Sequence, residues 1–431
     1  MTPRPAPPAV FGLTILPFAA AVGYVSIAAP FWLKSQGVSL AAIGGIQAAA
    51  MTPHALKFLW APLIDVGARR KAWFGWTTAA TAALLVALSV VPGLARHLGL
   101  FTLLATLAQV AGTTAAAAAD GLMAATTRFE DKGKAAGWRM AGNVGGTGAL
   151  GALALWLAAR SSPRAAGLAL AGVVLLSGLG ALAIREPRLQ DQRVESAGGL
   201  WRALWRQLAA VARDTWTTMV SREGWTGLVI CAAPVGAGAL TNLFSAMAVD
   251  YGASENLVAA VNGLGGGLAG ALGSLAGGVL ADRMNRRLAY ALAGGATALT
   301  AAAMLAAPLS AATYAWGTLA YNFMNGVAFA ALAAMILEMV GHSAAVATKY
   351  TLFIAMANVA SNYATALDGL ASEIPGWGSR GALAADVVLT AAGIAVLLAM
   401  VRYTRRAAAR PGRPAVAASG VAGRPPDPGG A

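Results

Sequence analysis

Long apolar stretches follow one another along the chain, and each could cross a lipid bilayer as a helix. A spanning helix needs about 20 apolar residues, and the 431-residue sequence contains about twelve such stretches. In the first half we expect them at 9–32, 40–63, 72–91, 98–125, 135–159 and 165–184, and in the second half at 225–247, 257–280, 289–307, 313–339, 347–369 and 382–401. The pattern predicts an all-α integral membrane protein with about twelve transmembrane helices.

Charged residues are too few for a chain that faces water on every side. They make up 11% of the sequence, against about 25% in soluble domains, and 58% of the residues are hydrophobic. The net charge of +14 could suggest nucleic acid, but Lys and Arg lie in short runs between apolar stretches, which is a topology signal. Phosphate-binding loops, metal-ligand clusters and nucleophile–base sets are missing from the sequence, so we expect neither an enzyme nor a cofactor.

The basic residues also predict the orientation. With the N-terminus inside, the connections on the cytoplasmic side collect about 25 Lys and Arg and the outer ones about 5. Both termini should therefore be cytoplasmic. Arg4 precedes the first apolar stretch, which is long enough to be a retained helix and not a cleaved signal.

A charged turn occurs at one fixed place in each half of the chain. The stretch KFLWAPLIDVGARRK (57–71) ends an apolar run in an acid and two arginines, and GGVLADRMNRRL (277–288) repeats the device. This internal repeat predicts two six-helix bundles, at 1–184 and 225–401, related by a pseudo-two-fold axis. Between them, 185–224 is expected to be a cytoplasmic linker, and 402–431 a disordered tail rich in Pro, Gly, Ala and Arg.

Two further patterns concern packing. Within the linker, Leu200–Val220 has Leu, Trp and Val at helical spacing, which indicates an interfacial amphipathic helix or a plain tether. The stretches 142–152 and 262–278 are rich in Gly at four-residue spacing, which lets helices approach closely. We expect these small residues to form a sliding contact between the halves; the alternative is packing within one half.

The second charged turn carries a family resemblance. Residues 278–287 read GVLADRMNRR and resemble the G-x-L-x-D-R-x-x-R-R signature of the major facilitator superfamily. The resemblance implies a cytoplasmic gate that is latched in one state and broken in the other; the alternative is a static charge pair that sets topology. The gate would consist of Asp65, Arg69, Arg70, Asp282, Arg283, Arg286 and Arg287.

Three patches narrow the resemblance to the AmpG-type permeases and the related acetyl-CoA and siderophore transporters. They are KFLWAPLID (57–65), DKGKAAG (131–137), similar to E-R-G-x-A-x-G, and ATKY (347–350), similar to A-T-Q-Y. Lys349 replaces the glutamine of the last motif, and Ala115 and Ala116 stand where this group often has Q-D.

Charges inside the apolar stretches point to a functional pair. Lys57 precedes Asp65 by as much as Asp120 precedes Arg128, which puts both about 12 Å inside the cytoplasmic helix ends. An unpaired charge at that depth costs several kcal/mol, so we predict a Lys57–Asp120 pair. The pair is either structural or carries the transported proton on Asp120.

Uncharged polar residues are candidates for a central cavity, because the resemblance implies that helices one, four, seven and ten line the pore. Most intramembrane amides only join helices, so these are hypotheses. By contrast, Glu338, Asp368 and Asp386 are expected near helix ends and in solvent. The cavity candidates, with the third patch included, are Tyr24, Gln109, Asn242, Asn322, Asn325, Lys349 and Tyr350.

The sequence thus predicts a secondary active transporter that works by alternating access. We expect proton-coupled uptake of a polar metabolite, muropeptide-like or siderophore-like, by a monomer in a bacterial-type inner membrane. Its partners would be the solute, protons and the lipid bilayer. The rival interpretations are a proton-driven exporter and a membrane assembly or scaffold protein that kept the fold and lost transport.

Overall fold

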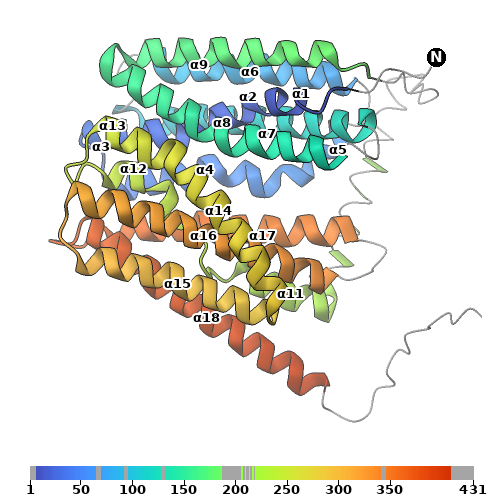
Figure 1. Cartoon of the computed structure of the whole chain (residues 1–431), viewed down its shortest axis with the longest axis vertical. Helices are drawn as coiled ribbons and strands as arrows, with labels where there is room; N and C mark the ends of the chain where they lie inside the picture. Colours follow the sequence, from blue (N-terminus) through green and yellow to red (C-terminus); the bar gives the residue numbers. More distant parts are fainter. Residues whose placement is uncertain are drawn as a thin grey trace, which may run out of the picture.

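A computed structural model describes residues 6–64, 69–91, 96–127, 132–186, 221–340 and 346–408, together with eight residues between 205 and 220. All secondary-structure elements of the described residues are helices, and Figure 1 shows them arranged in two stacked bundles. Residues 6–186 form the upper bundle and residues 222–408 the lower one. The all-α, two-bundle architecture predicted from the apolar stretches is confirmed.

The N-terminal bundle contains six spans, some of them built from several pieces. The first span contains a π-helical segment, and the second is interrupted by a short 3₁₀ turn. These segments are α1 (Val10–Thr14), α2 (Leu16–Gly23), η1 (Tyr24–Ala28) and α3 (Ala29–Ser35); α4 (Leu40–Leu56), η2 (Lys57–Leu59) and α5 (Ala61–Ile64); α6 (Arg70–Val90); α7 (Leu98–Thr126); α8 (Lys132–Arg160); and α9 (Pro163–Gly178) with η5 (Leu179–Ala183).

The C-terminal bundle repeats this plan. Its first span is broken in the middle, and its second contains another π-helical segment. The segments are α11 (Arg222–Ala232), η6 (Ala239–Asn242) and α12 (Phe244–Met247); α13 (Glu255–Val258), η7 (Ala259–Gly265) and α14 (Gly266–Arg283); α15 (Arg286–Ala306); α16 (Ala311–Val340); α17 (Val346–Ala371); and α18 (Ser379–Ala408).

Two expected helices are interrupted for reasons visible in the sequence. The helix expected at 40–63 ends at Leu56, because Pro53 removes one backbone donor and strains the last turns. The helix expected at 225–247 stops at Ala232, before Pro234. Among the described residues, eight helices are long and apolar enough to cross a membrane by length and composition alone, and both interrupted spans fall outside that set.

Two sides of the molecule differ in how tightly the bundles meet. We call the side where α3, α12 and α13 meet the closed side, and the opposite one, where α1 begins and α18 ends, the terminus side (Figure 1). On the closed side, Lys34 of α3 forms a 3.6 Å ion pair with Asp250, which follows α12. Arg160 at the end of α8 donates a hydrogen bond to Asn256 of α13 at 3.2 Å. One buried apolar cluster continues from the first bundle into the second there.

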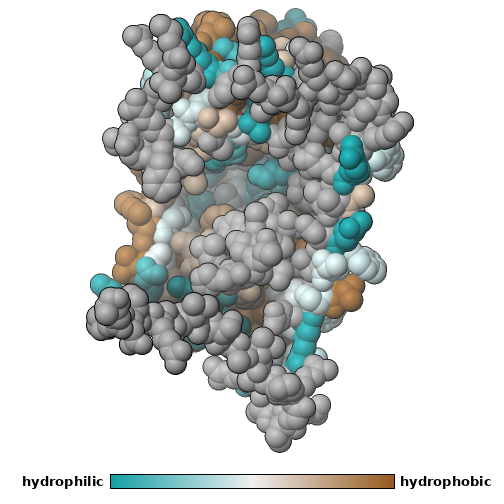
Figure 2. Space-filling model, turned by 90° about the vertical axis from the view of Figure 1, so that its right-hand side faces the viewer, coloured by the Kyte–Doolittle hydropathy of each residue, from teal (hydrophilic) through white to brown (hydrophobic). Residues whose placement is uncertain are grey.

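Toward the terminus side the bundles separate. Figure 2 views this side and shows hydrophilic side chains in a recess between the two halves. The structure therefore has one sealed side and one open side, the arrangement of a carrier that exposes its centre to one compartment at a time.

Part of the glycine-rich surface packs within each bundle, which is the alternative to the predicted contact between the halves. Gly273 and Gly277 of α14 lie against the backbone of α16 at Phe323 and Val327. Gly142 of α8 lies in the same way against α1 of its own half. Close packing within a bundle therefore accounts for the four-residue spacing.

Other glycines meet across the halves, and one of these contacts joins the two predicted stretches. Gly44 of α4 lies against Gly369 of α17, and Gly148 of α8 lies against Gly263 of η7. At these two places the backbones of the two bundles approach each other closely.

The predicted linker and tail are only partly described. The described residues between 205 and 220 are helical and exposed, among them Trp205 and Trp216, but the rest of the predicted amphipathic helix lies outside the described residues. The tail was expected from 402, whereas α18 continues to Ala408; residues 409–431 lie outside the description.

Candidate functional site

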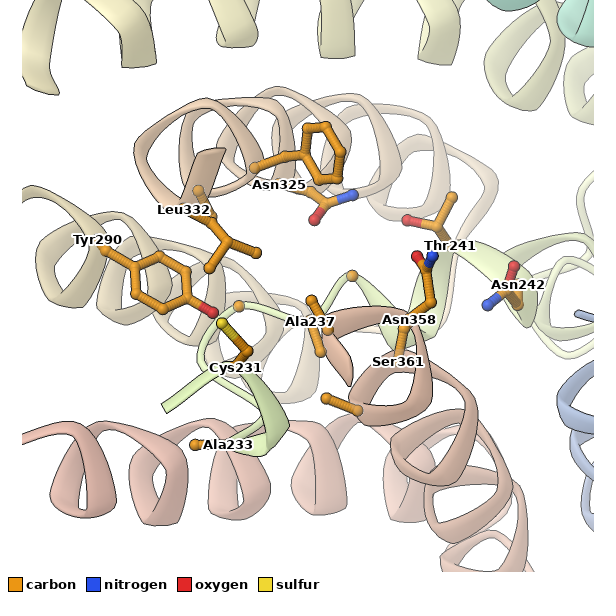
Figure 3. A pocket seen from close by; sticks show the side chains of 16 residues that line it. Cys231, Ala233, Ala237, Thr241, Asn242, Tyr290, Asn325, Leu332, Asn358 and Ser361 are labelled. Atoms are coloured by element: carbon orange, nitrogen blue, oxygen red, sulfur yellow. The ribbon is translucent and has the colours of Figure 1, made fainter. Parts of the chain in front are cut away.

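A cavity of about 250 Å³ lies within the C-terminal bundle, between α16, α17 and the broken first span. Figure 3 shows Asn325 of α16 and Asn358 of α17 with their amides directed into the same space. Thr241 and Ser361 add hydroxyl groups to its wall. Apolar side chains such as Leu332 fill the rest, so the site combines apolar area with a few hydrogen-bonding groups, as solute sites do.

The break between α11 and η6 forms one wall of this cavity. Gly236 and Gly238 have positive φ angles of 58° and 68°, which L side chains rarely adopt. At Gly238 a side chain would also collide with the amide of Asn325. Non-helical backbone at membrane depth is tolerated only where it lines a cavity or is buried in protein. The break thus adds backbone polar groups to the site.

A second cavity, of about 290 Å³, lies between the two bundles. Both π-helical segments reach it: η1 contributes Ser26, and η7 contributes Asn262 and Gly263. Asn143 and Thr147 of α8 line it from the first half. π-helical segments inside α-helices occur frequently at functional sites. Thr241 and Asn242 line both cavities and make them neighbours.

Three predicted cavity residues lie at these cavities. Asn242 borders both, Asn322 borders the second and Asn325 the first. Asn242 donates a hydrogen bond to the Thr365 hydroxyl at 3.1 Å, and Thr241 donates one to Asn322 at 3.3 Å. None of the described side chains that line either cavity is charged.

The other predicted cavity residues either line neither cavity or lie outside the described residues. The Tyr24 hydroxyl turns toward α6 and donates to the Leu88 carbonyl at 3.5 Å. Gln109 is fully buried and bonds to His54 at 3.0 Å, away from both cavities. The structure thus corrects the expectation that these two line the central space. The side chains of Lys349 and Tyr350 lie outside the described residues.

Asp120 has a different partner from the predicted one. Arg139 of α8 donates two hydrogen bonds to the Asp120 carboxylate, one from Nε and one from Nη2, the latter at 2.7 Å. Lys57 lies close enough to interact electrostatically with Asp120 and Arg139. It forms no ion pair with any described residue. The predicted Lys57–Asp120 pair is corrected to Arg139–Asp120, because Arg139, two turns inside α8, reaches α7 with a planar, two-donor group.

The predicted gate is partly visible. Asp65 lies outside the described residues, and Arg69 is exposed just before α6. The backbone N–H groups of Arg70 and Lys71 donate to Glu186, which places an anion at the N-terminus of α6. Sequence reasoning did not foresee this contact.

In the second turn, Asp282 and Arg283 are exposed. Arg286 forms a 3.4 Å ion pair with Glu338 of α16. The Arg287 Nε is buried without a hydrogen-bond partner. Among the described residues the acid of the turn thus has no ion pair, and a neighbouring glutamate holds the arginine.

Two acids expected in solvent are buried instead. Asp368 of α17 is 0% exposed, and Asp386 of α18 is 3% exposed. Both fall near the ends of the expected stretches 347–369 and 382–401, but α18 begins earlier, at Ser379, and puts Asp386 two turns inside. The early start of α18 is the signal that was missed.

These features define the class of protein: a multi-pass membrane carrier with two bundles, a central polar site, one sealed side and one open side. The chain belongs to the Major Facilitator Superfamily, whose family model matches residues 11–361. By this family it is a membrane transporter.

Solved structures of the same fold are similar in shape and distant in sequence. A bacterial homologue of the human lysosomal transporter Spinster, inward-facing and unoccupied, has 15% identity and a TM-score of 0.66 over 92% of this chain and 96% of its own. The nucleoside transporter NupG has 10% identity and a TM-score of 0.66 over 92% and 98%. A D-xylose-proton symporter has 13% identity and a TM-score of 0.67 over 91% and 95%. No curated protein matches the sequence.

Proposed function

We propose that the protein takes up a polar, largely uncharged solute into the cytoplasm and that a proton gradient drives this uptake. The observation that carries the proposal is the uncharged, amide- and hydroxyl-rich lining of both cavities. Asn, Thr and Ser offer donors and acceptors together, which suits a solute with many hydroxyl or amide groups. A carboxylate or phosphate in the same space would lack a cationic partner among the described lining residues.

The patches that resemble AmpG-type permeases support two solute classes. Muropeptides and siderophores are rich in amides and hydroxyls, and the uncharged part of either suits this lining. Sugars and nucleosides share the same chemistry, and structural neighbours of the chain include carriers of both. A scaffold without transport has no use for a polar cavity, so the cavities favour a working carrier.

The terminus side is proposed to be cytoplasmic. The excess of Lys and Arg in the connections on that side supports this orientation. The conformation described here would then be open to the cytoplasm, and the exposed, unpaired Asp282 would be the gate in its broken state.

Transport assays in proteoliposomes test the function. The full-length protein would be given a nucleoside, a pentose, a muropeptide and a ferric siderophore, each with and without an imposed pH gradient. We expect one of them to accumulate only when the outside is acidic. Outward movement would show an exporter, and no binding or flux of any amide- or hydroxyl-rich solute would contradict the proposal.

The role of Asn325 is tested with the solute found in that screen. Asn325→Ala should raise KM about tenfold, because one hydrogen bond to the solute is worth about 1.4 kcal/mol. The matched control is Gln36→Ala, which removes an amide from an exposed position after α3 and should leave KM unchanged. Equal KM values for Asn325→Ala and wild type would remove this cavity from the solute site.

Cysteine labelling tests the orientation. A cysteine at Ser161, exposed between α8 and α9, should react with an impermeant reagent in intact cells. A cysteine at Ser196, in the predicted linker, should react only after lysis. The opposite labelling pattern would show that the protein has the reverse orientation in the membrane.

A further inference from the structure

Three helices of the C-terminal bundle bring two carboxylates and a phenol to one buried place. Tyr321 of α16 donates its hydroxyl to both oxygens of Asp386, on α18, at 3.1 and 3.2 Å. Asp368, on α17, acts electrostatically on Asp386 and on Tyr321. The ring of Phe244 packs edge-on against Tyr321 and makes the surroundings apolar.

Among the described residues, Asp368 has no partner for its charge. Both of its carboxylate oxygens are buried without a hydrogen bond. No described Lys, Arg or His forms an ion pair with it or with Asp386. Two uncompensated negative charges in an apolar interior would cost several kcal/mol or more. The geometry therefore requires a positively charged ligand.

Other titratable groups near these helices are engaged elsewhere. Arg380, on the first turn of α18, is exposed, and Asp250 pairs with Lys34 at the closed-side surface. His54 of α4, which packs on α17, bonds to Gln109. Among the described residues, the Tyr321 hydroxyl is the titratable group that forms a hydrogen bond with the pair.

We propose that Asp368 and Asp386 share one exchangeable proton and form the proton-binding site of the transport cycle. Two close carboxylates without a cation hold a proton between them, because both cannot be ionised at once. Binding forms one O–H bond on a carboxylate oxygen from a proton of the water phase, and release returns the proton to water. A metal ion fits less well: the described residues contain no group of three or more His, Cys, Asp or Glu side chains.

The pair is connected to the solute cavities through both of its helices. Thr365 lies one turn before Asp368 on α17 and accepts a hydrogen bond from Asn242, which borders both cavities. Asn322 follows Tyr321 on α16 and borders the second cavity. A solute that contacts Asn242 and Asn322 therefore acts on the two helices that carry Asp368 and Tyr321, which links its binding to the proton. This coupling, unlike the site itself, rests on the proposed function.

Infrared spectroscopy of the full-length protein in lipid vesicles tests the site without any solute. The probe is the proton: the carbonyl stretch of a protonated carboxyl group is followed against pH, in sodium chloride and in choline chloride. We expect a band at neutral pH that is lost on alkalinisation and is the same in both salts. The double variant Asp368→Asn/Asp386→Asn should lack it, and Glu373→Gln, which neutralises an exposed acid after α17, should keep it.

Each other result overturns the proposal. A wild-type spectrum without the band shows two ionised carboxylates. A band removed by sodium shows a sodium site, and a band that persists at every pH shows a fixed, structural proton. Tyr321→Phe guards against misfolding of the double variant: it removes one hydrogen bond to a carboxylate, so the band should persist to higher pH.

A second measurement separates this site from the proposed function. With a solute identified in the transport screen, Asp368→Asn should still exchange labelled solute across the vesicle membrane but fail to accumulate it under a pH gradient. Wild-type accumulation by this variant would overturn the coupling role, even with the band confirmed. A band without any transported solute would leave the proton site standing and contradict the transport proposal.

Discussion

Arg139 and Asp120 join α7 to α8. Their two hydrogen bonds align the planar guanidinium with the carboxylate, and both side chains are partly exposed, at 22% and 40%. Water therefore shares in solvating the pair, so its contribution to stability is smaller than that of a fully buried one.

Stability measurements identify the partner of Asp120. Arg139→Gln or Asp120→Asn alone should lower the free energy of unfolding by about 1–3 kcal/mol, because each leaves one charge without its partner. The double variant should recover most of that loss. Thermal unfolding in detergent, analysed as a double-mutant cycle, measures the coupling.

Lys57→Met is the control for this cycle. Lys57 forms no ion pair with a described residue but interacts electrostatically with Asp120, so its substitution should couple to Asp120 much less strongly than that of Arg139. A coupling of Lys57 with Asp120 as large as that of Arg139 would restore the pair predicted from the sequence.

At the residue scale, the sequence could predict that Asp120 needs a cation but not which one. Lys57 and Arg139 both fall at a suitable depth, and only the approach of α7 to α8 decides between them. The same limit explains Asp368 and Asp386. Asp386 lies two turns inside because α18 already begins at Ser379, and the polar residues Ser379 and Arg380 hide this start in a search for apolar stretches.

At the scale of elements, one face of α14 consists of small residues and lies directly on α16. An added Cβ at Gly273 would collide with the backbone of Phe323, whereas one at Gly278 would meet nothing within 4 Å. These two positions, on one helix, test the packing against the intrinsic helix preference of alanine.

The two substitutions should have opposite effects. Gly273→Ala should lower the free energy of unfolding by about 1–3 kcal/mol, since α14 must move away from α16. Gly278→Ala should raise it by about 0.5–1 kcal/mol, because alanine restricts the unfolded chain. Unfolding temperatures of both variants in the same detergent give the comparison; similar shifts would mean that this face is not tightly packed.

Helix breaks were predictable in part. Pro53 and Pro234 mark the two interruptions, and Gly236 and Gly238 beside the second indicate a turn. The apolar runs continue through these positions, however, and length alone favoured unbroken helices. The π-helical segment η1 has no such marker, whereas η7 contains Gly263, at which the helix is kinked.

At the scale of the whole molecule, the contacts of the closed side determine which compartment reaches the centre. Lys34 and Asp250 connect the two halves, and Ser379 donates a further hydrogen bond to Asp250 from α18. Breaking these contacts favours the opposite conformation without touching the cavities.

Asp250→Asn should make the closed side more accessible. A cysteine placed at Ala253, which is buried in the apolar seal, should react faster with a water-soluble thiol reagent in this background than in the otherwise wild-type chain. Glu373→Gln, at an exposed acid on the same side, serves as the control. Equal rates in all three backgrounds would show that the ion pair does not hold the side shut.

The close approach of Gly44 to Gly369 gives the molecule unequal lever arms. From this point the closed-side end of α4 is about 6 Å away along the helix, whereas the opposite end of α17 is about 35 Å away. If each half turns as a rigid body about the glycines, a shift of about 1 Å at the short arm becomes one of about 6 Å at the long arm. A small separation of the helices on the closed side would thus move their ends on the terminus side by a distance comparable to the width of a solute.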